Sequence, residues 1–78
     1  MPRIPLPCLK CGEAGIVCDN LAVGGMRRRL QDVGLIAGTR VVCVHKSPLG
    51  DPTAYCILDA VIALRAGDAR CVIVEVQS

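Results

Sequence analysis

Cysteines supply the first residues in this chain that could do chemistry. Among six cysteines and one histidine in 78 residues, only Cys8 and Cys11 have the two-residue spacing of a metal-binding or redox pair. Two thiolates at that spacing can occupy two corners of a tetrahedral Zn or Fe(II) site. A closed site needs four ligands, so Cys43, His45 or a second subunit would have to complete it. The sequence leaves two interpretations open: a chance pair near the N-terminus, or a metal or redox site at Cys8 and Cys11.

Catalytic chemistry has little support in the sequence. The one histidine, His45, has no candidate Ser or Cys nucleophile outside the predicted core. Four further cysteines lie in apolar, strand-like runs, where a free thiol packs as a small hydrophobic side chain: Cys18, Cys43, Cys56 and Cys71. Because no secretory signal precedes them, we expect reduced thiols and a cytoplasmic location. Because His45 lacks a nucleophile partner, we expect no enzymatic activity.

Charge and aromatic content exclude two classes of partner. Nine basic and seven acidic side chains give a net charge of only +2, and Tyr55 is the one aromatic residue. A nucleic-acid-binding protein would need many more cations, or rings on which bases can stack, so we expect no nucleic acid partner. No apolar run approaches the roughly 20 residues that a bilayer crossing requires, so we expect no direct membrane insertion.

The elements that must position these residues are mostly strands. Val and Ile outweigh the strong helix formers among the bulky residues, which favours strands. Four segments bounded by Gly, Pro or Asp are predicted as strands: 14–21, 39–46, 53–64 and 70–76. We expect the long third segment to reverse near residues 58–60, which makes five strands.

One short helix interrupts this pattern. Met26, Leu30 and Val33 recur at helical spacing, and Gly34 follows as the expected C-terminal cap. We expect residues 1–7 to be a Pro-rich leader and residues 8–78 to be a single domain. The sequence therefore predicts an all-β fold, a small SH3-like barrel of about five strands with one short helix.

Three separated motifs in this order carry a family resemblance: MRRRLQDVGLIAGT at residues 26–39, SPLGDP at 47–52 and ALR at 63–65. The chain resembles the FeoA family over residues 9–76. The resemblance implies a cytosolic SH3-like domain that assists a FeoB-type ferrous iron transporter without catalysis of its own. It also implies a relationship to the C-terminal domain of DtxR-type repressors, which is one alternative function. A small Zn- or Fe-binding module built on Cys8 and Cys11 is the other, and Cys11 stands where the family usually has Pro.

Candidate partner-binding residues come from three surfaces. If Val41 and Cys43 face inward, as the resemblance implies, Val42 and Val44 face outward, and Ile73 faces outward between the inward Val72 and Val74. Exposed aliphatic patches mark protein contacts or self-association, so we expect a partner surface or a homo-oligomer there. Further candidates are Leu49 on a rigid turn and an arginine of the short helix: Arg27, Arg28 or Arg29.

Overall fold

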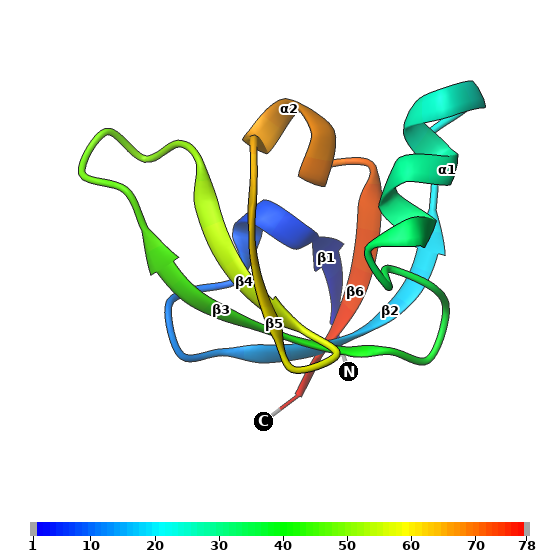
Figure 1. Cartoon of the computed structure of the whole chain (residues 1–78). Helices are drawn as coiled ribbons and strands as arrows, with labels where there is room; N and C mark the ends of the chain where they lie inside the picture. Colours follow the sequence, from blue (N-terminus) through cyan, green and yellow to red (C-terminus); the bar gives the residue numbers. More distant parts are fainter. Residues whose placement is uncertain (1, 78) are drawn as a thin grey trace.

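An antiparallel sheet of six strands forms most of the protein (Figure 1), and the computed structural model describes residues 2–77. The strand order is β1-β6-β2-β3-β4-β5, so β1 and β5 are the two edges. The strands are β1 (Arg3–Pro5), β2 (Ala14–Asn20), β3 (Arg40–Lys46), β4 (Thr53–Ile57), β5 (Ala60–Leu64) and β6 (Val72–Gln77). Three short helices connect them: η1 (Leu6–Cys8), α1 (Gly24–Asp32) and α2 (Ala66–Ala69). The predicted all-β class is confirmed.

An aliphatic core fills the concave side of the curled sheet. The inward-facing residues of the middle strands are fully buried, as are leucines from the connecting segments: Val41, Cys43, Tyr55, Ile57, Val72, Val74, Leu6, Leu9 and Leu35. The inward orientation predicted for Val41, Cys43, Val72 and Val74 is therefore confirmed. Within residues 2–77, no helix has the length and apolar character needed to cross a bilayer.

The predicted Pro-rich leader contributes a strand to the sheet. Ile4 of β1 pairs with Val74 of β6, and Leu6 and Leu9 just after it enter the core. The three prolines at positions 2, 5 and 7 argue against a strand, because proline cannot donate to a ladder. At the edge of the sheet that restriction disappears. The strand count is therefore six rather than five.

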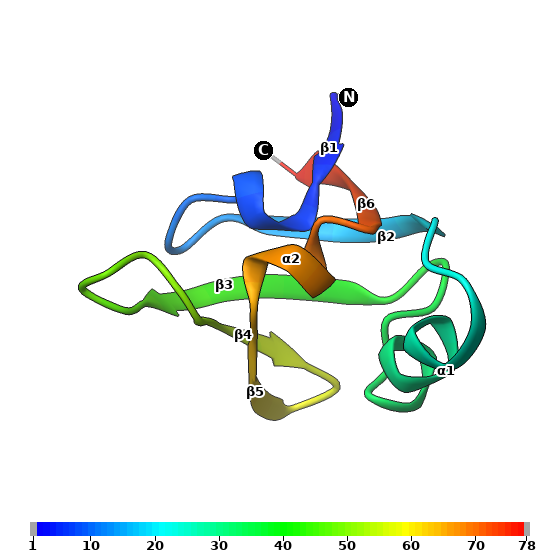
Figure 2. The ribbon, with the colours of Figure 1, turned by 90° about the horizontal axis from the view of Figure 1, so that it is seen from above.

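Helix α1 ends as the sequence predicts. Leu30 is buried, with Met26 and Val33 packed against the core. Gly34 has a φ of +104°, its N–H donates to Gln31 O, and the N–H of Leu35 donates to Leu30 O. This pair of bonds is a Schellman motif, which turns the chain sharply toward β3. Figure 2 shows α1 to one side of the strands.

The hairpin between β4 and β5 reverses at Leu58 and Asp59, as expected. Both residues have positive φ values, 50° and 66°, which is the geometry of a two-residue type I′ turn. The tip of this hairpin lies against the turn after α1. A Cβ atom on Gly34 would lie 2.6 Å from Leu58 Cδ1 and 3.0 Å from Ile57 Cγ2. Only glycine therefore fits at position 34.

Replacing Gly34 by Ala should destabilise the fold by about 2 kcal/mol, because the substitution combines left-handed backbone with a close contact to the hairpin. Chemical denaturation of both proteins measures the difference. Gly25→Ala is the matched control, since a Cβ there meets nothing within 4 Å. We expect Gly25→Ala to be neutral or slightly stabilising, and an equal loss in both variants would contradict this account.

Tyr55 provides a pH-dependent test of the core. Burial, with a smaller effect of the nearby Cys43, raises the pKa of Tyr55 to about 12. Since the folded state holds the phenolic proton more tightly than the unfolded state, stability from this group is present below pH 10 and falls as pH rises toward about 12. Tyr55 is the only aromatic residue, so tyrosinate absorbance titrates it alone.

We expect an absorbance midpoint near 12 in the native protein and near 10 in denaturant. Tyr55→Phe should remove this part of the alkaline destabilisation at little cost, because Tyr55 Oη is buried without a hydrogen-bond partner within residues 2–77. A native midpoint at the denatured value would show that the ring is not buried.

Candidate partner-binding surface

The convex side of β3, β4 and β5 is apolar as well. Strand pairing sets Val42, Cys56 and Val61 side by side on this side, because each is the direct cross-strand neighbour of the next. Val61 is 65% exposed, and Val44, in the β-bulge between Cys43 and His45, is 47% exposed. We call these four residues, Val42, Val44, Cys56 and Val61, the outer face. Val42, Cys56 and Val61 are contiguous across the three strands, Val44 follows Val42 two residues along β3, and none of the four belongs to the core.

A groove borders the outer face. Its volume is about 510 Å³, and it lies between the turn that precedes β3 and the tip of the β4–β5 hairpin. Val42, Cys56 and Leu58 supply apolar lining, while Arg40 and Asp59 supply one charge of each sign. The Arg40 guanidinium is also directed to Gln77 Oε1, at 3.4 Å. The groove can therefore receive an apolar side chain flanked by polar groups.

Ile73 does not belong to this surface. It pairs with Pro5 on one side and Asp19 on the other, whereas Val42 pairs with Ala14 near the opposite end of β2. Strand β2 also separates β3 from β6. The structure therefore brings together Val42 and Val44 but leaves Ile73 on a different part of the sheet.

The three arginines of α1 differ in their contacts. Arg27 Nη1 donates to Asn20 O at 2.7 Å, and Asn20 Nδ2 donates back to Arg27 O at 3.2 Å. This reciprocal pair fastens the helix to the end of β2, so Arg27 has a structural role. All three arginines are exposed, but within residues 2–77 Arg28 and Arg29 make no side-chain hydrogen bond like that of Arg27. Of the three, these two are the candidates for a partner's carboxylates.

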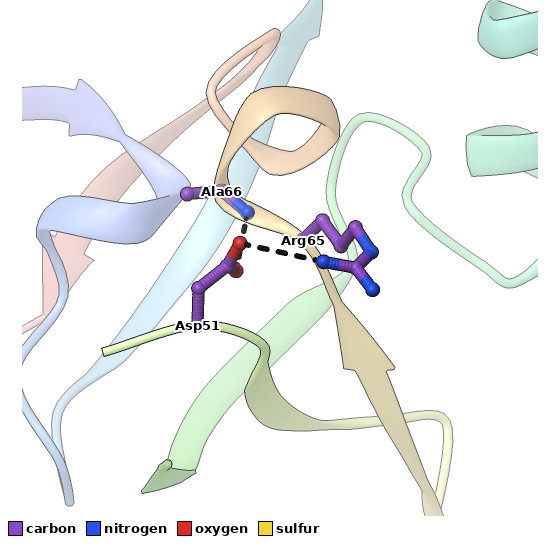
Figure 3. Close-up of polar contacts among 3 residues, drawn as sticks. All are labelled: Asp51, Arg65 and Ala66. Carbon is purple, nitrogen blue, oxygen red and sulfur yellow. Dashed lines mark hydrogen bonds and ion pairs between the residues drawn. The ribbon is translucent and has the colours of Figure 1, made fainter. Parts of the chain in front are cut away.

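The SPLGDP motif forms the expected rigid turn. Gly50 N–H donates to Ser47 O at 2.8 Å, and Leu49 at the turn is 95% exposed. Asp51 then reaches the ALR motif (Figure 3): its Oδ1 accepts the N–H of Ala66 at 2.8 Å, and its Oδ2 lies 4.0 Å from Arg65 Nη1. Asp51 thus caps α2, whose own N-cap residue Arg65 makes no side-chain cap bond.

Cys8 and Cys11 do not form a metal site with other described residues. Cys8 and Cys11 are both exposed, and within residues 2–77 no group of three or more His, Cys, Asp or Glu side chains could hold a metal ion. Cys11 instead lies near Cys43. Burial, and then the neighbouring Cys11, raise the pKa of the Cys43 thiol.

Sequence reasoning missed Cys56, Leu58 and Val61. The alternation rule that placed Val42 outward also applies to β4 and β5, once the reversal at residues 58–59 is fixed. Extending that rule across the hairpin would have found the outer face. The exposed Leu21, Val23 and Ile36, which lie around α1, carry no such signal in the sequence.

Replacing Asp51 by Ala should cost about 1 kcal/mol of stability through the lost cap of α2. Asp51→Asn should cost less, because an amide oxygen can still accept the Ala66 N–H. Arg65→Ala should change stability by a few tenths of a kcal/mol, since its ion pair is mostly exposed. Thermal unfolding of the three variants ranks them, and a larger loss for Arg65→Ala than for Asp51→Ala would contradict this assignment.

Comparison with known proteins places the chain in a family. A family model described as the FeoA domain matches residues 4–76. A fusion of Fe(2+) transport protein A with the Fe(2+) transporter FeoB from Porphyromonas gingivalis is 31% identical over 70 residues, which are 90% of this chain and 8% of that protein. The chain therefore spans a small fraction of the fusion protein's length.

Solved structures show the same fold. An FeoA-like protein from Clostridium acetobutylicum has a TM-score of 0.91 at 27% identity, covering 100% of this chain and 91% of its own. FeoA of Stenotrophomonas maltophilia, solved with zinc and described as an SH3 domain protein, has a TM-score of 0.80 at 27% identity, covering 90% and 87%. With its motifs, its SH3-like sheet and this match over nearly its whole length, the chain belongs to the FeoA family, which is associated with ferrous iron transport.

Proposed function

We propose that this FeoA-family chain is a noncatalytic cytosolic accessory protein that binds a FeoB-type ferrous iron transporter. The observation that carries the proposal is the Porphyromonas gingivalis relative, in which an FeoA segment and FeoB are one chain. Covalent fusion holds two partners at high effective concentration, and separate chains need a binding surface to achieve the same proximity. The Stenotrophomonas maltophilia FeoA, described as a candidate activating factor of ferrous iron transport, supports the same role.

The outer face is the surface best suited to that contact. Its apolar side chains lie on three paired strands, so docking there orders little backbone. Contiguous exposed apolar residues beside a groove are typical of protein contact sites. Arg40 and Asp59 at the groove can fix the orientation of the bound segment through polar contacts.

Leu49 and the arginines of α1 are proposed as secondary contacts. Leu49 projects from a turn closed by the Gly50 to Ser47 hydrogen bond, and Arg28 and Arg29 are exposed on the helix. Arginines at the rim of an interface act mainly on association rate and on orientation. We therefore assign the largest share of affinity to the outer face.

A cytosolic, noncatalytic role agrees with the side chains present. All six cysteines are free thiols, the state that a reducing compartment maintains. His45 is exposed on β3 opposite Ala54, which offers it no acid, base or nucleophile as a cross-strand partner. The chain would then influence the transporter by binding alone.

The double variant Val44→Ser, Val61→Ser tests the surface. Both side chains are about half exposed or more, so the fold should survive while the apolar contact is lost. We expect the Kd for the purified full-length FeoB-type transporter of the same organism to rise roughly 10- to 100-fold, because contact residues of this kind contribute about 1 kcal/mol each or more. Biolayer interferometry with the transporter in nanodiscs measures the change.

Val23→Ser is the matched control, because Val23 is an exposed valine at 82% that lies at the start of α1, away from the outer face. An unchanged Kd in the double variant, or an equal rise in the control, would reject the outer face as the contact. Absence of binding by the unmodified chain would reject the accessory function itself.

A further inference from the structure

The turn before β2 brings Cys11 close to Cys43 in the middle of β3. Glu13 N–H donates to Lys10 O at 2.9 Å and closes a turn with Cys11 at its tip. The next residue, Gly12, donates its N–H to Cys43 O at 2.7 Å, and Cys43 N–H donates to Glu13 O at 3.0 Å. These two bonds fix the turn against the backbone of Cys43 itself.

The two thiols have opposite access to solvent. Cys11 is exposed, whereas Cys43 is completely buried and points into the core beside Tyr55. After burial, the neighbouring Cys11 contributes to the raised pKa of Cys43, as expected where the two side chains are close to each other. An oxidant in solution therefore reaches Cys11 before it reaches Cys43. Cys43 is then the neighbouring thiol with which an oxidised Cys11 can react.

We propose that Cys11 and Cys43 are an oxidation site that forms a disulfide on exposure to a peroxide. In the first step the Cys11 thiol reduces hydrogen peroxide, which yields a sulfenic acid at Cys11 and one water. In the second step the Cys43 sulfur attacks the Cys11 sulfur, the S–S bond forms, and the hydroxyl leaves with the Cys43 proton as a second water. Two electrons pass from the two thiols to one peroxide.

Cys8 is the competing partner for Cys11. It has the sequence spacing of a redox pair, but it lies at the end of η1, and the fully buried Leu9 separates it from the turn. The backbone bonds of the turn lead to Cys43 rather than to η1. The disulfide would tie the turn to β3, to which its backbone is already hydrogen-bonded at Cys43.

Peptide mapping of the full chain distinguishes the two pairings. Trypsin places Cys8 in residues 4–10, Cys11 and Cys18 in residues 11–27, and Cys43 in residues 41–46. After treatment with hydrogen peroxide and blocking of free thiols, we expect a cross-link between peptides 11–27 and 41–46. Cys11→Ser should abolish this product, while Cys18→Ser and the matched exposed variant Cys8→Ser should retain it.

A dominant cross-link between peptides 4–10 and 11–27 would overturn the proposal. So would full alkylation of Cys43 in oxidised, then unfolded protein, since a disulfide protects both of its thiols. The inference goes beyond the accessory function, because the mapping uses the purified chain without a transporter. Failure of either proposal therefore leaves the other intact.

Discussion

The alternation of side chains along β3 and β4 determines which residues form the core and which form the outer face. On β3 and β4, successive side chains point to opposite sides of the sheet, and both sides receive apolar residues. Val41, Cys43, Tyr55 and Ile57 build the core, while Val42 and Cys56 build the outer face. A shift of one residue in the register would exchange the two sets. The same pairing therefore secures the interior and presents the candidate contact surface.

The periodicity of apolar residues in the sequence was sufficient to predict most of the helices and strands. The stripe of Met26, Leu30 and Val33 predicted α1, and the break at residues 58–59 predicted a hairpin, because these signals are local. Strand β1 and helix α2 escaped prediction for equally local reasons. Proline disguises an edge strand, and four residues are too few to show helical periodicity.

The candidate site was harder to predict because it depends on which strands are neighbours. Parity correctly placed Val42 and Val44 outward, but parity on separate strands cannot say that Ile73 lies beyond β2. The roles of Arg27 and Asp51 depend on partners 7 and 15 residues away in the chain, Asn20 and Ala66. No spacing rule anticipates such contacts, since they depend on how the strands and helices are arranged in space.

The attachment of α1 at both of its ends has a mechanical consequence. Near its start, the Asn20–Arg27 pair joins the helix to β2, and after its end Gly34 fits closely against the β4–β5 hairpin. The helix is thus attached at one end to β2 and at the other to the β4–β5 hairpin, which are different parts of the sheet. A partner that binds Arg28 or Arg29 and displaces the helix would therefore also displace the strands to which the helix is attached. Binding at the helix and binding at the hairpin would therefore affect the same connected part of the structure.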